Sequence, residues 1–174
     1  MATFDAAIPV ILEHEGGYVN NVHDDGGATN FGISDRADGK VDGKIDLNRD
    51  GKTLVDPAEL TRDQAVAYYR KFYWRPEFEQ IKSQAVATQL FDITVNSGYG
   101  VVPKMVQRAV NAAGGHLVVD GVMGAGTITA LNALDENVFL RKLTRERAMF
   151  YVGLVEKNPS QIAFLRSWLG RIFA

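Results

Sequence analysis

Residues 14–33, HEGGYVNNVHDDGGATNFGI, gather carboxylates and hydroxyl groups around two glycine pairs. Glu15 precedes the first pair, and Asp24 lies nine residues later, just before the second. Two carboxylates that face one cleft can cleave a glycosidic bond, because one protonates the leaving oxygen while the other handles water or the oxocarbenium charge. Thr29 adds a hydroxyl that can hold the water. By spacing alone, an Asp-Gly hairpin turn with solvated acids explains the stretch equally well.

The element that must position Glu15 is a helix near the N-terminus. Thr3 can cap this helix and the Gly16-Gly17 pair can end it, so Glu15 falls in the last turn. The negative end of the helix dipole disfavours a charged carboxylate there, which suits a proton donor, although position alone favours an idle, exposed glutamate. The apolar face of the helix is expected to consist of Phe4, Ala7, Ile8, Ile11 and Leu12.

The rest of the chain predicts a mainly α, lysozyme-like α+β fold with one small β-hairpin near the active site. Residues 18–55 lack a helical period and are rich in Gly, Asp and Asn, with extended candidates near Tyr18–Asn20 and Phe31–Ile33. Thr61 and Gln64 form a capping box, and the helix that follows ends before Pro76. Further helices are predicted at about 84–96, 103–113 and 127–156.

The final predicted helix begins at Asn158-Pro159 and lies in the basic C-terminal part of the chain. Residues 140–174 hold 7 basic and 2 acidic side chains, whereas residues 1–60 hold 5 basic and 12 acidic ones. A basic helix can attract anionic envelope lipids, although a solvated face explains the charge more simply. We expect Ile162, Leu165, Leu169 and Ile172 to pack on the core, and Arg166 and Arg171 to stay exposed.

The motif in residues 14–33 closely resembles the N-terminal signature of glycoside hydrolase family 108, the muramidases of bacteriophage endolysins. In that signature Glu-Gly-Gly-Tyr is followed by Asp-x-Gly-Gly-x-Thr-x-x-Gly-Ile, and every position is present here. The similarity continues in YYRKFYWRP and FDITVNSGYG, and residues 107–131 look like the peptidoglycan-binding region of such enzymes. It implies a catalytic lobe at 1–97 and a helical peptidoglycan-binding lobe at 98–174, packed as one compact unit.

The resemblance also implies roles for individual residues. Glu15 would be the general acid, Asp24 the base or electrostatic stabiliser, and Thr29 the residue that positions the water. Asp25 departs from the pattern by making two adjacent acids, which leaves open which of the two faces the sugar. Substrate contacts are implied at Tyr18, Gly27, Asn30, Tyr73 and Asn96.

The implied function is hydrolysis of the β-1,4 bond between N-acetylmuramic acid and N-acetylglucosamine in peptidoglycan by an endolysin. The alternatives are a lytic transglycosylase acting on the same bond and a non-catalytic wall-binding protein. Lacking a basic n-region, the N-terminus reads as neither a signal peptide nor a membrane span, so the enzyme is expected in the host cytoplasm until a separate pore-forming protein releases it. We expect a monomer that does not bind nucleic acid.

No cofactor is expected for the reaction, but one loop has the spacing of a calcium site. Asp46, Asn48 and Asp50 occupy positions one, three and five of a calcium loop, with Gly51 at position six. Position twelve is Pro57 where a bidentate glutamate is needed, so an ion-free Asp/Gly loop is the simpler interpretation. The chain has no cysteine and no HExxH motif, which argues against thiolate metal sites and zinc peptidase chemistry.

Overall fold

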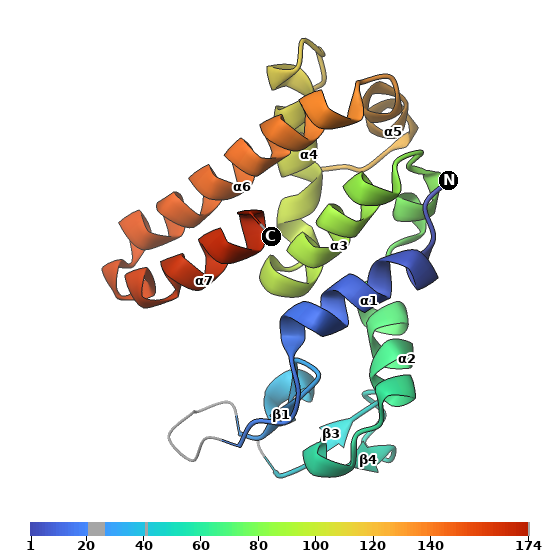
Figure 1. The fold of residues 1–174 in the computed structure, drawn as a ribbon, viewed down its shortest axis with the longest axis vertical. Coiled ribbons are helices and arrows are strands. Elements are labelled where there is room, and N and C mark those ends of the chain that lie inside the picture. The colour runs from blue at the N-terminus through green and yellow to red at the C-terminus, as the bar shows by residue number, and fades with distance from the viewer. Residues whose placement is uncertain (21–26, 41, 174) are drawn as a thin grey trace. The chain divides into compact units, whose positions relative to one another are not determined.

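The computed structural model describes residues 1–20, 27–40 and 42–173, and they form two compact units (Figure 1). One unit holds Phe4–Trp74, and the other holds Arg75–Ala174 together with Met1–Thr3. Across the described residues α-helices predominate and the strands form only two short antiparallel hairpins. The predicted mainly α, lysozyme-like class is therefore confirmed. Among the described helices, none combines the length and apolar content needed to cross a bilayer.

Two helices frame the first unit. Helix α1 (Phe4–Glu15) buries its predicted apolar face, except that Leu12 is only half-buried, and ends at Gly16 with a φ of 71°. Helix α2 (Arg62–Phe72) starts with the predicted capping box, in which the Gln64 amide donates to the Thr61 hydroxyl at 3.3 Å and the Thr61 amide donates back to Gln64 Oε1 at 2.9 Å.

Two hairpins lie between these helices, where the sequence predicted one. Strand β1 (Thr29–Asn30) pairs with β2 (Ile33–Ser34), and β3 (Ile45–Asp46) pairs with β4 (Leu54–Val55). The second hairpin was missed because its strands carry no alternating pattern and the segment between them has the spacing of a calcium loop. Of the predicted extended segments, Val19 forms a bridge to Thr29, whereas Phe31 lies in a turn.

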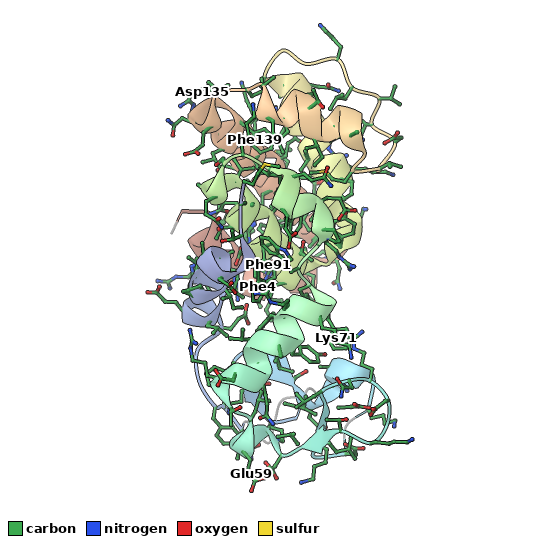
Figure 2. All side chains as sticks on the ribbon, turned by 90° about the vertical axis from the view of Figure 1, so that its right-hand side faces the viewer. Phe4, Glu59, Lys71, Phe91, Asp135 and Phe139 are labelled. Atoms are coloured by element: carbon green, nitrogen blue, oxygen red, sulfur yellow. The ribbon has the colours of Figure 1, made fainter. Side chains whose placement is uncertain are left out.

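The second unit is a helical bundle. It comprises α3 (Gln84–Ser97), α4 (Val102–Ala112), α5 (Ala125–Asn132), α6 (Glu136–Lys157) and α7 (Ile162–Phe173). Helices α4 and α7 both contact α6, and α7 runs back alongside it in Figure 1. Phe91 of α3 and Phe139 of α6, both labelled in Figure 2, are fully buried in the core of this unit.

The single helix predicted at 127–156 is wrong, because the chain forms two helices there. Helix α5 ends at Asn132, and the Asp135 side chain then accepts the Val138 amide at 3.0 Å as the N-cap of α6. An aspartate in this position competes with continuous helix, since its short side chain offers the backbone a capping bond instead.

The predicted start and packing of the C-terminal helix need three corrections. Asn158 caps a 3₁₀ turn at Pro159–Gln161, so α7 starts later than expected, and Ile162 is 64% exposed. Arg171 is not exposed: its guanidinium pairs with the buried Asp92 carboxylate at 3.2 Å. Arg166 is exposed as predicted, and Ile172 is buried. The sequence pattern could not reveal Asp92, because the partner lies 79 residues away.

Candidate active site

The end of α1 and the first hairpin meet at Glu15 and Gly32. A β carbon built on Gly32 would lie 2.7 Å from both Cβ and Cδ of Glu15, a separation that real side chains do not tolerate. Gly32 also has a φ of 73°, in the region that only glycine adopts readily. The glycine therefore serves two purposes, since it forms the turn and lets the turn press against the carboxyl of Glu15.

The turn itself is held in an unusual backbone conformation. Phe31 and Gly32, the two central residues, both have positive φ values, 48° and 73°, as a type I′ hairpin turn requires. For Phe31 this conformation costs about 1–2 kcal/mol. The Tyr69 hydroxyl, on the buried face of α2, donates to the Phe31 carbonyl at 2.8 Å and helps to hold the strained turn beside Glu15.

Thr29 lies in the middle of this small β structure. Its backbone exchanges two hydrogen bonds of 2.8 Å with Val19, and it is also the register partner of Ser34 in β2. The chain that leaves Glu15 thus returns along Thr29, as the predicted order of acid, turn and hairpin requires. Asp24 and Asp25 lie outside the described residues.

Tyr73 is a largely buried tyrosine whose hydroxyl has a raised pKa. Burial is the largest cause that raises the pKa of the Tyr73 hydroxyl. The neighbouring Tyr68 and the Glu15 carboxylate also raise this pKa, whereas the Arg49 guanidinium lowers it. The hydroxyl therefore stays protonated near neutral pH and can donate a hydrogen bond. Tyr73 follows the last turn of α2, and its ring centroid lies 5.5 Å from that of Tyr69.

Gly27, at the start of the described hairpin segment, passes close to Asp35. A β carbon on Gly27 would come within 2.8 Å of Asp35 Oδ2, and the φ of Gly27 is 72°. Asp35 is buried and accepts the backbone amides of Asp42, Gly43 and Lys44 at 3.2, 2.9 and 3.1 Å. Asp35 therefore ties the next loop to the base of the hairpin.

The remaining implied substrate residues have different surroundings. Tyr18 is 48% exposed, whereas Asn30 is buried and its Nδ2 donates to the Pro57 carbonyl at 2.8 Å. Asn30 thus has a structural contact, and its role in binding substrate stays a prediction. Asn96 lies in α3 of the other unit, half-buried, with Oδ1 accepting the Tyr151 hydroxyl at 2.8 Å.

In the candidate calcium loop, both carboxylates accept backbone amides. Asp46 accepts those of Asn48 and Gly51 at 3.1 and 2.6 Å, and Asp50 accepts those of Lys52 and Thr53 at 2.8 and 3.0 Å. Within the part of the chain that the structure describes, no group of three or more His, Asp or Glu side chains is arranged to hold a metal ion. The loop geometry agrees with an ion-free turn, and calcium binding stays a prediction.

The sequence predicted neither the amide contacts of Asp35 nor the hydrogen bond from Tyr69 to the Phe31 carbonyl. Tyr69 could have been suspected, because a buried tyrosine generally needs a partner for its hydroxyl. Asp35 carries no such signal, since a single acid after a short strand looks like any other loop residue.

Comparisons with known proteins give matches over most of the chain. The glycosyl hydrolase 108 family model matches residues 8–98, just over half of the chain, and a model described as a Predicted Peptidoglycan domain matches residues 101–173. The chain is similar to the solved structure of Brucella abortus SagA, with 25% identity and a TM-score of 0.64 over 98% of this chain and 93% of that chain. None of the curated proteins compared with the chain matches it.

Proposed function

Since the chain belongs to the glycosyl hydrolase 108 family and carries a peptidoglycan-binding domain, we propose that it cleaves the β-1,4 bond between N-acetylmuramic acid and N-acetylglucosamine. The coarser statement, a glycoside hydrolase that acts on peptidoglycan, follows from the two domains. The observation that best supports the finer one is the close approach of Gly32 to Glu15, because it brings the Thr29 hairpin beside a helix-terminal acid.

In the proposed reaction Glu15 donates its proton to the glycosidic oxygen as the bond to the sugar breaks. Asp24 takes a proton from the attacking water or stabilises the oxocarbenium charge, and Thr29 holds that water. The water oxygen then bonds to the anomeric carbon. The products are two sugar chains, one with the hydroxyl of the water on its anomeric carbon and the other with a proton on the former glycosidic oxygen. The Tyr73 hydroxyl, whose raised pKa keeps it protonated near neutral pH, can donate a hydrogen bond to the substrate.

The stereochemical outcome depends on the separation of the two carboxyl groups. The lysozyme-like resemblance favours inversion, for which the carboxyl groups lie about 6.5–9.5 Å apart, whereas retention needs about 5–5.5 Å. Proton NMR of the first product formed from a defined oligosaccharide distinguishes the two outcomes by the anomeric signal. An initial β-anomer from the β-linked substrate would overturn inversion.

The fragment masses test the reaction itself. Hydrolysis adds one water to each cleaved bond, so fragments of purified wall should carry a reducing end. A lytic transglycosylase needs only one acid and leaves an anhydro-sugar. Its product is therefore lighter than the hydrolysis product by the mass of one water molecule. Anhydro-muramic ends as the main product would overturn hydrolysis, and intact wall after incubation would favour a wall-binding protein without activity.

We also propose separate roles for the two parts of the chain, and a role for the enzyme in the release of phage from its host. Residues 1–97 would carry catalysis and residues 98–174 would hold peptidoglycan.

An endolysin role requires that the enzyme stay harmless in the host cytoplasm until a separate pore-forming protein releases it. Expression in a bacterium with and without such a protein tests this, and lysis by the enzyme alone would contradict it.

A further inference from the structure

The second unit contains a cavity of about 200 Å³ between α3, α6 and α7. Sites that hold drug-sized ligands measure roughly 300–1,000 Å³, so this cavity suits one substituent of a sugar rather than a whole chain. Trp168 stacks on Tyr151 at one wall, with ring centroids 4.9 Å apart and planes inclined by 20°. The residues that line the cavity are Asn96, Ser97, Phe150, Tyr151, Leu154 and Trp168.

Hydrogen-bond direction orients the amide of Asn96. Arg147 Nε donates to the Tyr151 hydroxyl at 2.9 Å, and a guanidinium group can only donate. The Tyr151 proton is therefore free to go to Asn96 Oδ1, at 2.8 Å. The Ser97 hydroxyl donates to the same oxygen at 3.1 Å. Because Oδ1 receives both donors, the two protons of Nδ2 are directed elsewhere.

The residues that hold the Tyr151 hydroxyl in place are themselves buried and ion-paired. Arg147 is 1% exposed and pairs with Asp92, which is 2% exposed and also receives Arg171 from α7. A buried ion pair with both partners satisfied holds its geometry, since leaving either charge alone would be costly. The orientation of Asn96 is thus set by Tyr151 and Ser97, which line the cavity, and Tyr151 is in turn held by Arg147, which does not.

We propose that this cavity binds the acetamido group of a peptidoglycan sugar, with Asn96 Nδ2 donating to the acetamido carbonyl and the methyl group lying against Trp168. The six lining side chains carry no formal charge, which fits a neutral group and disfavours phosphate or ammonium. An apolar wall with one oriented donor matches a methyl group beside a carbonyl. The choice of a sugar as the source of this group rests on the proposed function.

The binding test uses the full chain and a soluble sugar. Tri-N-acetylchitotriose should shift the ¹⁵N-detected signals of the Asn96 side-chain amide and the Trp168 indole, whereas the fully deacetylated trisaccharide should leave both unchanged. Acetyl-D-alanyl-D-alanine is the third arm, because a peptide stem also presents a methyl group near a carbonyl. Shifts from the dipeptide without shifts from the acetylated sugar would overturn the proposal, as would equal shifts from both trisaccharides.

A matched pair of variants isolates the amide donor. Asn96→Asp keeps an acceptor for Tyr151 and Ser97 but replaces the Nδ2 donor by an acceptor, so affinity for tri-N-acetylchitotriose should fall about tenfold or more. Asn137→Asp makes the same change at an exposed position near the start of α6 and should bind like the wild type. Wild-type affinity in Asn96→Asp, with an unchanged melting temperature, would overturn the proposal.

Wall hydrolysis is measured on the same samples, so that a failure of the cavity proposal can be distinguished from a failure of the proposed hydrolysis. If the wild type releases reducing ends but does not distinguish the acetylated from the deacetylated trisaccharide, the cavity proposal fails and the proposed hydrolysis stands. If the acetylated trisaccharide binds but no reducing ends are released, the hydrolysis fails and the cavity proposal stands.

Discussion

Gly32 lies so close to Glu15 that a β carbon at residue 32 would come within 2.7 Å of the Glu15 carboxyl carbon. The hairpin turn and the proposed acid can share this space only while residue 32 has no side chain. The contact joins two residues 17 positions apart in sequence and determines how near the Thr29 hairpin comes to the end of α1.

The first prediction concerns this contact. Gly32→Ala should displace the Glu15 carboxyl and lower wall lysis by at least tenfold, because small misplacements of a reacting group are costly. Gly39→Ala is the matched control, since Gly39 also has a positive φ, 91°, but meets nothing within 4 Å. Both variants should lose about 1 kcal/mol or more of stability from backbone strain. Equal lysis by the two variants would show that the contact is unimportant.

The second prediction separates the three acids of the motif. Glu15→Gln removes the proton donor with little change in volume, so lysis should fall by orders of magnitude. Asp24→Asn should cost about 10²–10⁴-fold. Asp25→Asn should cost less than about tenfold, because the family signature places its aspartate at residue 24. Lysis rates are compared at matched melting temperature. A severe loss at Asp25 with near-normal activity at Asp24 would shift the assignment by one residue.

The third prediction concerns the two arginines of α7. Arg171→Ser removes a charged hydrogen bond to Asp92 and should cost roughly 1.5–3 kcal/mol, measured by denaturant unfolding. Arg166→Ser, at an exposed position, should change stability by less than about 0.5 kcal/mol. A small effect of Arg171→Ser would mean that Arg147 alone satisfies Asp92.

The fourth prediction tests membrane attraction with the exposed variant. Because Arg171 is paired with Asp92, Arg166 remains the exposed basic residue among the described side chains of α7, beside exposed Ile162 and Phe164. Arg166→Ser should weaken binding to phosphatidylglycerol vesicles about fivefold, as about 1 kcal/mol per basic residue implies. Unchanged binding would remove the lipid proposal without affecting the packing of α7.

The fifth prediction concerns the 46–51 loop. Calcium that binds only the folded chain must raise its melting temperature, so a rise in millimolar calcium over chelator is the expected sign of a site. Asp46→Asn should abolish that rise. Identical melting curves in calcium and chelator would leave the loop as an ion-free turn.

The same loop should contribute to acid sensitivity. Burial raises the pKa of Asp46, but the amides of Gly51, Asn48, Asp50 and Arg49 together outweigh burial and hold it below 3.8. A lowered folded pKa means that the stabilisation is complete above 3.8 and is lost as pH falls through 3.8 toward the folded value. The drop in melting temperature from pH 6 to pH 3 should therefore be smaller in Asp46→Asn than in Lys52→Gln, which keeps the carboxylate.

Local signals in the sequence were enough for many elements. The α1 face, the Thr61 capping box and the helices α3 and α4 follow from apolar spacing and capping residues within a few turns. The resemblance of residues 14–33 to the family was equally local, and the match to the glycosyl hydrolase 108 model confirms it. The same locality misled the prediction at 127–156, where apolar spacing continued past a cap at Asp135.

The family and the residue types of the proposed acid, hairpin and glycine turns could be read from the amino-acid sequence, because these depend on neighbours in the chain. The pairs of side chains that meet could be identified only from the folded chain: Gly32 against Glu15, Gly27 against Asp35, and Arg147 and Arg171 around Asp92. These contacts depend on packing between distant segments, and the burial that makes Asp92 require two arginines exists only once α3, α6 and α7 have come together.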